Sequence, residues 1–222
     1  MTRTGKLVYD ETPEDWSTSF REAWGANGGH AQSLAFALGG LRRIFTMPDF
    51  APFTALRYIH PDQYAFNHFK VHDYGCATGD GTALLQAAFV GANVTGFDTS
   101  EVAIDVARSR WPGMQFEVGD VRAPREDANI IWTSHTLEHT RDAAFCVNGL
   151  LARCQALVVI VPWISAIYHA GHEGAEHTSE WLKRCPPPTH SETFNIMRYN
   201  PEVNVWIAEG SWMYVWQGEL KA

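Results

Sequence analysis

An alternation of strand-like and helix-like runs is the feature that most constrains the fold of this chain. Apolar strand-like runs occupy residues 69–74, 93–98, 114–120, 129–134 and 156–161, and helix-like runs at 81–89, 100–111 and 141–154 lie among them. Strands that alternate with helices form βαβ units, which build a parallel sheet covered by helices on both faces. The run ALVVIV at 156–161 is apolar throughout, as is typical of a central parallel strand. The sequence therefore predicts an α/β fold.

The C-terminal part continues with two more strand-like runs, at residues 193–200 and 206–216. We expect a turn near Glu209–Gly210 and a sheet that ends in an antiparallel edge. Trp206, Trp212 and Trp216 alternate along this part and are expected to pack within the fold.

Residues 1–68 carry no strand signal and are expected to form a helical extension or lid. Aromatic residues recur every four positions on one helical face (Trp16, Phe20 and Trp24), and leucines mark a second helix (Leu34, Leu38 and Leu41). Gly39–Gly40 should weaken or end that second helix. The chain thus divides into an N-terminal extension at 1–68 and a single compact domain at 69–222.

Charge and cysteine usage narrow the classes of function. The formal net charge of the 222 residues is −8, which disfavours binding to a phosphate backbone. The four cysteines have no CxxC spacing, so a zinc knuckle or a redox dithiol is not indicated. The N-terminal segment is polar, and the longest apolar stretch is too short to span a bilayer. We expect a cytoplasmic protein with reduced thiols that binds neither nucleic acid nor a membrane, and a homodimer is left open.

The stretch KVHDYGCATGDGTALL, residues 70–85, joins the first strand to the helix that follows it. Gly75 and Gly79 allow a tight turn and a close approach of the backbone to a ligand. A nicotinamide-binding turn would read GxGxxG and hold a pyrophosphate. Here Ala77 and Asp80 occupy the other fingerprint positions, and Asp73 precedes the turn. Two carboxylates suit a ligand that carries an ammonium and a sulfonium better than a pyrophosphate.

Two further acids follow the next strands. Asp98 ends the second strand, at the spacing from the glycine turn where a doubly wound fold places the acceptor for ribose hydroxyls. Asp120 ends the third strand. Because parallel strands end at one edge of the sheet, these acids are expected to line a nucleoside pocket together with Asp73.

Four segments in order resemble the successive motifs of class I S-adenosylmethionine-dependent methyltransferases: VHDYGCATGDGTALL, VTGFDTSEVAIDVAR, FEVGDV and IIWTSHTLEHT, within residues 69–163. The resemblance implies a Rossmann-like, mostly parallel sheet of seven strands with an antiparallel last strand. It implies that Asp73 and the Gly75–Gly79 loop hold the methionine part of the cofactor, Asp98 the ribose, and Asp120 with Val121 the adenine. The full set of cofactor residues that it implies is Asp73, Tyr74, Gly75, Cys76, Ala77, Gly79, Asp98, Thr99, Asp120, Val121 and Ser134.

Histidines and glutamates cluster after the fourth and fifth strands, where the resemblance places the transferable methyl group. If TSHTLEHT turns helical, His135, Glu138 and His139 share one face. A second group follows the fifth strand, with His169, His172, Glu173, Glu176 and His177.

Three interpretations of this cluster stay open. A histidine acts as a general base towards a hydroxyl, with His135, His139 and His177 as candidates beside Glu138. Alternatively, His135, Glu138, His139 and His177 bind a divalent metal. In the third interpretation these are ordinary polar loop residues.

The sequence thus predicts S-adenosylmethionine-dependent methylation of a small neutral or cationic acceptor, such as the hydroxyl of a sugar-bearing or phenolic natural product or metabolite. Two alternatives are N-methylation by proximity alone and a non-catalytic subunit that binds S-adenosylmethionine. A nicotinamide oxidoreductase is disfavoured because GxGxxG is missing.

Overall fold

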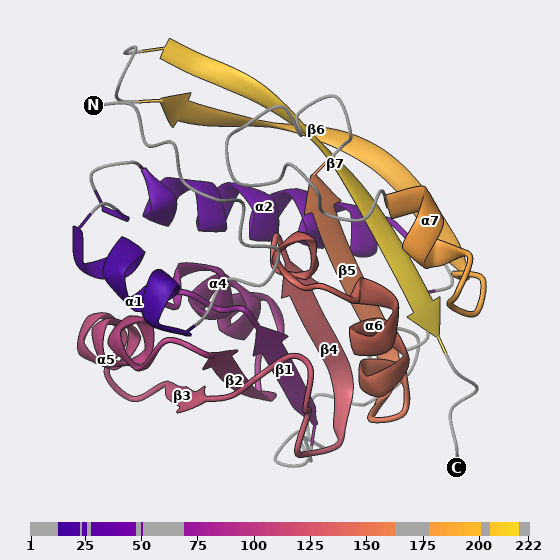
Figure 1. The fold of residues 1–222 in the computed structure, drawn as a ribbon, viewed down its shortest axis with the longest axis horizontal. Helices are drawn as coiled ribbons and strands as arrows, with labels where there is room; N and C mark the ends of the chain where they lie inside the picture. The colour runs from indigo at the N-terminus through magenta and orange to yellow at the C-terminus, as the bar shows by residue number, and fades with distance from the viewer. Residues whose placement is uncertain are drawn as a thin grey trace.

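The computed structural model describes residues 13–22, 24–25, 28–47, 50, 69–162, 178–200 and 205–217 of the chain. A single sheet forms the middle layer, and helices pack on it from both sides (Figure 1). Its strands are β1 Lys70–Tyr74, β2 Asn93–Asp98, β3 Gln115–Val118, β4 Ala128–Ser134, β5 Cys154–Pro162, β6 His190–Asn200 and β7 Val205–Gln217.

The seven strands lie in the order β3-β2-β1-β4-β5-β7-β6. The pairs β1–β2, β1–β4, β2–β3 and β4–β5 are parallel, whereas β7 runs antiparallel to both β5 and β6. The predicted α/β sheet with an antiparallel last strand is confirmed. One detail of the prediction is wrong: β7 passes through Glu209 and Gly210 without a turn, because Gly210 pairs with Asn195 of β6 inside the ladder.

The helices cover the two faces unequally. On one face lie α2 Gly29–Ile44, α4 Asp80–Ala88 and α5 Glu101–Arg110, with α1 Pro13–Glu22 against α5. On the other face lie α6 Ala143–Leu151 and α7 Thr178–Leu182. Ser100 caps α5, since its side chain accepts a hydrogen bond from the backbone N–H of Ala103.

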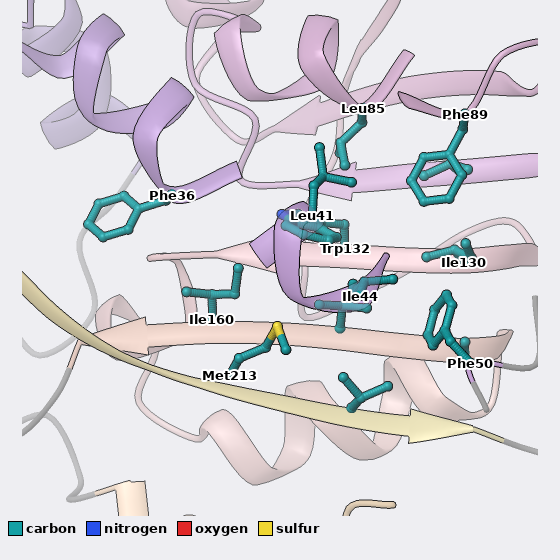
Figure 2. Close-up of a cluster of buried hydrophobic side chains, with 14 of the residues drawn as sticks. Phe36, Leu41, Ile44, Phe50, Leu85, Phe89, Ile130, Trp132, Ile160 and Met213 are labelled. Carbon is teal, nitrogen blue, oxygen red and sulfur yellow. The ribbon is translucent and has the colours of Figure 1, made fainter. Parts of the chain in front are cut away.

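The larger core lies between α2, α4 and the sheet. Phe36, Leu41 and Ile44 of α2 belong to one buried cluster with Trp132 and Ile160 of the central strands (Figure 2). All five side chains are at most 3% exposed. This extensive burial makes α2 an integral part of the apolar core.

The buried face of α2 differs from the one that its leucines suggested. Leu34 and Leu38 are 39% and 59% exposed, and only Leu41 of that stripe is buried. The helix also continues through Gly39 and Gly40. A Cβ atom on Gly40 would lie 2.5 Å from Ile160 Cδ1 and 2.6 Å from the Trp132 ring. The glycine therefore lets the helix backbone rest directly on the sheet, and this close approach selects the buried face.

Replacing Gly40 with alanine should destabilise the protein by about 1–3 kcal/mol, because the added methyl overpacks the contact with Trp132 and Ile160. The matched control is Gly149→Ala in α6, where the nearest atom to the new Cβ is Pro124 Cδ at 4.0 Å. That variant should gain about 0.5–1 kcal/mol from helix propensity. Urea denaturation measures both, and equal effects of the two substitutions would contradict the close-approach explanation.

Candidate functional site

The turn after β1 runs through three residues with positive φ: Gly75 at 80°, Ala77 at 50° and Gly79 at 81°. A Cβ on Gly75 would overlap the side chain of Thr136, which follows β4. The same atom on Gly79 would lie 2.6 Å from the ring of Phe116. The tight turn expected at both glycines is present, and the close approach of the backbone to a ligand stays a prediction. Their missing side chains make room for neighbouring protein groups, and this packing fixes the path of the loop.

Asp98 ties this loop to the end of β2. Its Oδ2 accepts a hydrogen bond of 2.9 Å from the backbone N–H of Ala77, and its Oδ1 accepts one of 2.9 Å from that of Ser100. Burial raises the pKa of Asp98, and hydrogen bonds from the backbone oppose the rise. The carboxylate thus shapes the loop and still lines the cavity described below.

Asp73 is a buried carboxyl group at the end of β1. Its Oδ2 accepts a hydrogen bond of 2.6 Å from Thr82 Oγ1, and the residue is 5% exposed. Burial raises the pKa of Asp73 to about 7, the bond from Thr82 opposes the rise, and the charge of Asp98 adds to it. A cation placed beside Asp73 would favour its ionised form.

Asp80 is fully buried yet well compensated. Its Oδ1 accepts a hydrogen bond of 2.8 Å from Arg110 Nη2, and its Oδ2 lies 2.8 Å from His30 Nδ1 and accepts a bond from Thr78 Oγ1. His30 therefore links α2 to the start of α4.

The N-terminal segments make further contacts with the loop region. Trp24 Nε1 donates a hydrogen bond of 3.1 Å to Thr78 Oγ1, and the Ser17 and Ser100 hydroxyl oxygens are 3.0 Å apart. These contacts hold α1 and Trp24 over the carboxyl ends of β1 and β2.

A cavity of about 300 Å³ lies under these segments. This volume is at the lower end of the range of roughly 300–1,000 Å³ for small-molecule and cofactor sites. The cavity extends from the loop after β1 to the segment after β4. Its lining residues are Phe20, Trp24, Gln32, Ser33, Phe36, Ala37, Asp73, Gly75, Cys76, Ala77, Gly81, Asp98, Thr99, Gly119, Val121, Trp132, Ser134, His135, Thr136, Glu138 and His139.

Eight of the eleven predicted cofactor residues line the cavity: Asp73, Gly75, Cys76, Ala77, Asp98, Thr99, Val121 and Ser134. Tyr74, Gly79 and Asp120 are not among the lining residues. Tyr74 stacks on Phe97 on the other face of the sheet, with ring centroids 4.8 Å apart. Asp120 pairs with Arg122, whose Nη2 lies 2.7 Å from Asp120 Oδ2. Burial favours a higher pKa for Asp120, but hydrogen bonds from Arg122 outweigh it and lower that pKa.

Three of the predicted polar residues, His135, Glu138 and His139, lie together after β4 and are called the polar rim. Leu137–His139 form a short 3₁₀ turn, and His135 precedes it with a φ of 53°. Glu138 Oε1 lies 3.4 Å from His135 Nδ1 and 4.0 Å from His139 Nε2. All three side chains line the cavity. His177 and the other residues of the second predicted group lie outside the described residues.

A buried hydroxyl group in the cavity wall fits the binding of the implied cofactor. Ser134 Oγ is buried at the cavity wall and has no hydrogen-bond partner among the described residues. A buried hydroxyl in this state is an available group for a polar ligand. For a metal the fit is weaker, because the described ranges contain no group of three histidine, cysteine, aspartate or glutamate side chains arranged as ligands.

Sequence reasoning missed the contribution of α2 to the site. Gln32, Ser33, Phe36 and Ala37 line the cavity, although no motif marks them. The available signal was the spacing of Phe36, Gly40 and Ile44, which places a small residue between two large ones on one helical face. The stripe of leucines on α2 suggested a different buried face, so this spacing was not recognised.

Comparison with known proteins identifies the fold of this region. Residues 71–157 match the family model described as a methyltransferase domain. The chain is 35% identical over 95 residues to a trans-aconitate 2-methyltransferase of Methylobacterium radiotolerans, a match that covers 40% of this chain and 36% of the relative. The chain spans about a third of the length of the curated relatives that it matches.

Solved structures share the fold over nearly the whole chain. The plantazolicin methyltransferase BpumL in complex with SAH matches with a TM-score of 0.58 and 11% identity, covering 93% of this chain and 95% of that one. A SAM-dependent methyltransferase from Anabaena variabilis matches with a TM-score of 0.57 and 15% identity, covering 97% and 100%. At these identities the likeness is one of fold.

Asp73 should make the binding of S-adenosylhomocysteine dependent on pH. Its pKa is about 7 in the folded protein and near 4 in the unfolded chain, so the proton that stabilises the folded, ligand-free protein is lost as pH rises through 7. An ammonium group of the ligand favours the ionised form, so affinity should rise from pH 6 to pH 8 and then level off. Calorimetry in buffers of different ionisation enthalpy should detect proton release near pH 6.

The Asp73→Asn variant should bind more weakly at pH 8 and lose this pH dependence. Asp105→Asn, at an exposed aspartate of α5, is the matched control and should behave as the native protein does. A pH dependence that persists in Asp73→Asn would assign the titration to another group, with Asp98 the first candidate.

Asp98→Asn should weaken S-adenosylhomocysteine by about 1–3 kcal/mol, because the amide cannot replace a carboxylate that serves both the loop and a ligand hydroxyl. Asp120→Asn should cost less, since Arg122 already engages that carboxylate. Isothermal titration measures both. Equal losses would place Asp120 in the site on the same footing as Asp98.

Proposed function

Because residues 71–157 form a class I S-adenosylmethionine-dependent methyltransferase domain, we propose that this protein binds S-adenosylmethionine and methylates a hydroxyl group of a small molecule. One observation carries the proposal. A single cavity joins the loop, Asp73 and Asp98 at one end to His135, Glu138 and His139 at the other.

We assign residues at the cofactor end of the cavity to parts of S-adenosylmethionine by matching their charge and hydrogen-bonding groups. Asp73 would hold the ammonium of the methionine part, Asp98 the ribose hydroxyls, and Val121 the face of the adenine, with Ser134 available for a further hydrogen bond. When bound, S-adenosylmethionine supplies an electrophilic methyl group on a sulfonium.

At the acceptor end, the rim residues would position the hydroxyl and take up its proton. Neutral histidine near pH 7 suits this work, and a general base adds roughly 10²–10⁴-fold to a rate. His139 is the first candidate for the base, with Glu138 beside it. His135 also contacts Phe36 and Ser211. His177 stays a candidate from outside the described residues.

Charge in the cavity favours a neutral or cationic acceptor. The charged side chains among the described lining residues are carboxylates, namely Asp73, Asp98 and Glu138, and no lysine or arginine is among them. Arg110 nearby is engaged by Asp80. The segment 163–177 after β5 contains glutamates and no lysine or arginine. A tricarboxylate such as trans-aconitate would suit lysine or arginine partners, whereas these parts of the chain offer histidines alone as potential cations. We therefore propose a different acceptor class from that in the names of the relatives.

Of the predicted extension at 1–68, α1 and Trp24 are proposed as the lid over this site, because α2 belongs to the core. Phe20 and Trp24 line the cavity, and the hydrogen bond from Trp24 to Thr78 attaches the segment to the loop. Such an addition outside the shared sheet would close the site to water and help to select the acceptor.

Three alternatives predict different results. Methylation of an amine by proximity alone would need no base. A non-catalytic subunit would bind the cofactor and transfer nothing. A metal held by His135, Glu138, His139 and His177 would make turnover sensitive to chelators.

A panel of acceptors incubated with S-adenosylmethionine should identify the acceptor class. We expect methylated product, read by mass spectrometry, from phenols and sugar-bearing hydroxyl compounds and none from trans-aconitate. S-adenosylhomocysteine should raise the melting temperature and NAD should not. Product from trans-aconitate would overturn the charge argument. A failure to bind S-adenosylhomocysteine would overturn the proposed function itself.

With an acceptor identified, His139→Ala should lower turnover by roughly 10²–10⁴-fold and leave S-adenosylhomocysteine affinity nearly unchanged. The loss should shrink at high pH, where the acceptor ionises unaided. His190→Ala, on β6 beside Glu192, is the matched control. Excess chelator should leave turnover intact, and a loss that added Mg²⁺, Mn²⁺ or Zn²⁺ restores would instead support the metal. Near-native turnover of His139→Ala at neutral pH would exclude His139 as the base.

A further inference from the structure

Ser211 is a buried hydroxyl that no sequence motif marks. It lies on β7, where it pairs in register with Pro162 of β5 and Phe194 of β6, and it is 0% exposed. It is not among the residues that line the cavity. Its Oγ lies 3.2 Å from Nε2 of His135, a residue 76 positions away in the chain.

Described residues contact both ring nitrogens, one ring face and the backbone of His135, and the side chain also lines the cavity. Its Nδ1 lies 3.4 Å from Glu138 Oε1, and its ring stacks on Phe36 of α2 with the centroids 3.4 Å apart. Its backbone N–H donates a hydrogen bond of 2.8 Å to Ile160 O. The φ of 53° is uncommon for a residue other than glycine and persists only where the surroundings impose it.

These contacts favour one ring nitrogen as the carrier of the proton. An ionised carboxylate only accepts hydrogen bonds, so the nitrogen that faces Glu138 is favoured as the N–H donor. In neutral imidazole the other nitrogen, Nε2, then holds the lone pair and accepts a hydrogen bond from the Ser211 hydroxyl. That lone pair points at a fully buried group and not at the cavity.

We infer that Ser211 and His135 form a fixed pair that orients the Glu138 carboxylate at the acceptor end of the cavity. Ser211 and His135 are then positioning residues, and the proton of the acceptor goes to Glu138 or His139. The positioning role of the pair rests on the proposed function, whereas the contact between Ser211 and His135 does not depend on it.

The order serine, histidine, glutamate also occurs in nucleophilic hydrolases, where the serine attacks the substrate. A nucleophile has to contact the reacting atom. Ser211 is fully buried and lies outside the cavity lining. The arrangement therefore suits orientation and not covalent catalysis.

The tautomer of His135 tests the inference without an acceptor. In protein labelled with ¹⁵N-histidine, long-range ¹H–¹⁵N spectra distinguish a protonated Nδ1 from a protonated Nε2, and His135→Asn assigns the signal by its loss. We expect the Nδ1–H form in the native protein, with and without S-adenosylhomocysteine. Ser211→Ala should keep the Nδ1–H form that Glu138 favours but shift the Nε2 resonance, because the hydroxyl that donates to Nε2 is lost. Glu138→Gln provides a second variant, which should disturb the same signal from the other side of the ring if Ser211→Ala does not fold.

Thr133→Val is the matched control. Thr133 is a buried β4 hydroxyl, 1% exposed, that has no hydrogen-bond partner among the described residues and does not line the cavity. Its loss should leave the His135 signal unchanged. A native Nε2–H form, or an unchanged spectrum in Ser211→Ala, would overturn the inference.

Once an acceptor is known, Ser211→Ala should lower turnover by about tenfold to a hundredfold with unchanged S-adenosylhomocysteine affinity, as expected for a misplaced catalytic group. Native turnover in a folded Ser211→Ala would overturn the positioning role. Failure of S-adenosylhomocysteine to bind the native protein would count against the proposed function alone, because the tautomer can be measured without it.

Discussion

The direct contact of the α2 backbone with the sheet at Gly40 is the constraint on which the site depends. It brings Phe36 and its neighbours close enough to form one wall of the cavity. The same helix buries Leu41 and Ile44 in the larger core, so the wall is as rigid as the core itself. Phe36 in turn stacks on His135 and fixes one side of the polar rim. The contacts that pack α2 into the core therefore also fix the geometry of the site.

The buried acids around the loop differ in the groups that offset the cost of burying their negative charge. Asp80 has an arginine and a histidine beside it, and its role is to join α2, α4 and α5. Asp73 has a single hydroxyl donor, and burial holds its pKa at about 7. A buried carboxyl group without a cation is costly in the ionised form, and a cationic ligand removes that cost. The difference in compensation separates the acid with a structural role from the acid that we propose to bind the cofactor.

The sequence predicted most of the fold because its pattern repeats. Alternating apolar runs located β1, β2, β3, β4 and β5 and the helices between them, and the strand-end position of Asp98 indicated a ligand site. Where several signals competed, the sequence was ambiguous. Leu34 and Leu38 belong to a regular helical stripe, but both are exposed. Gly210 was expected in a turn, but it lies inside β7 and pairs with β6. Glycine has no side chain to reveal whether it bends the backbone or lets two backbones approach each other.

By itself the sequence determined the order of elements, the loop at Gly75–Gly79 and the acids at the strand ends, because these follow from short-range periodicity and from chain direction in a parallel sheet. Only the tertiary structure decided which distant residues complete the site. Phe36 from α2 and Ser211 from the antiparallel β7 meet His135 because the sheet places β7 next to β5, a neighbour relation that no local pattern encodes. The side-chain chemistry of the rim was readable in advance, but the orientation of its ring nitrogens was not, since orientation depends on contacts made after folding.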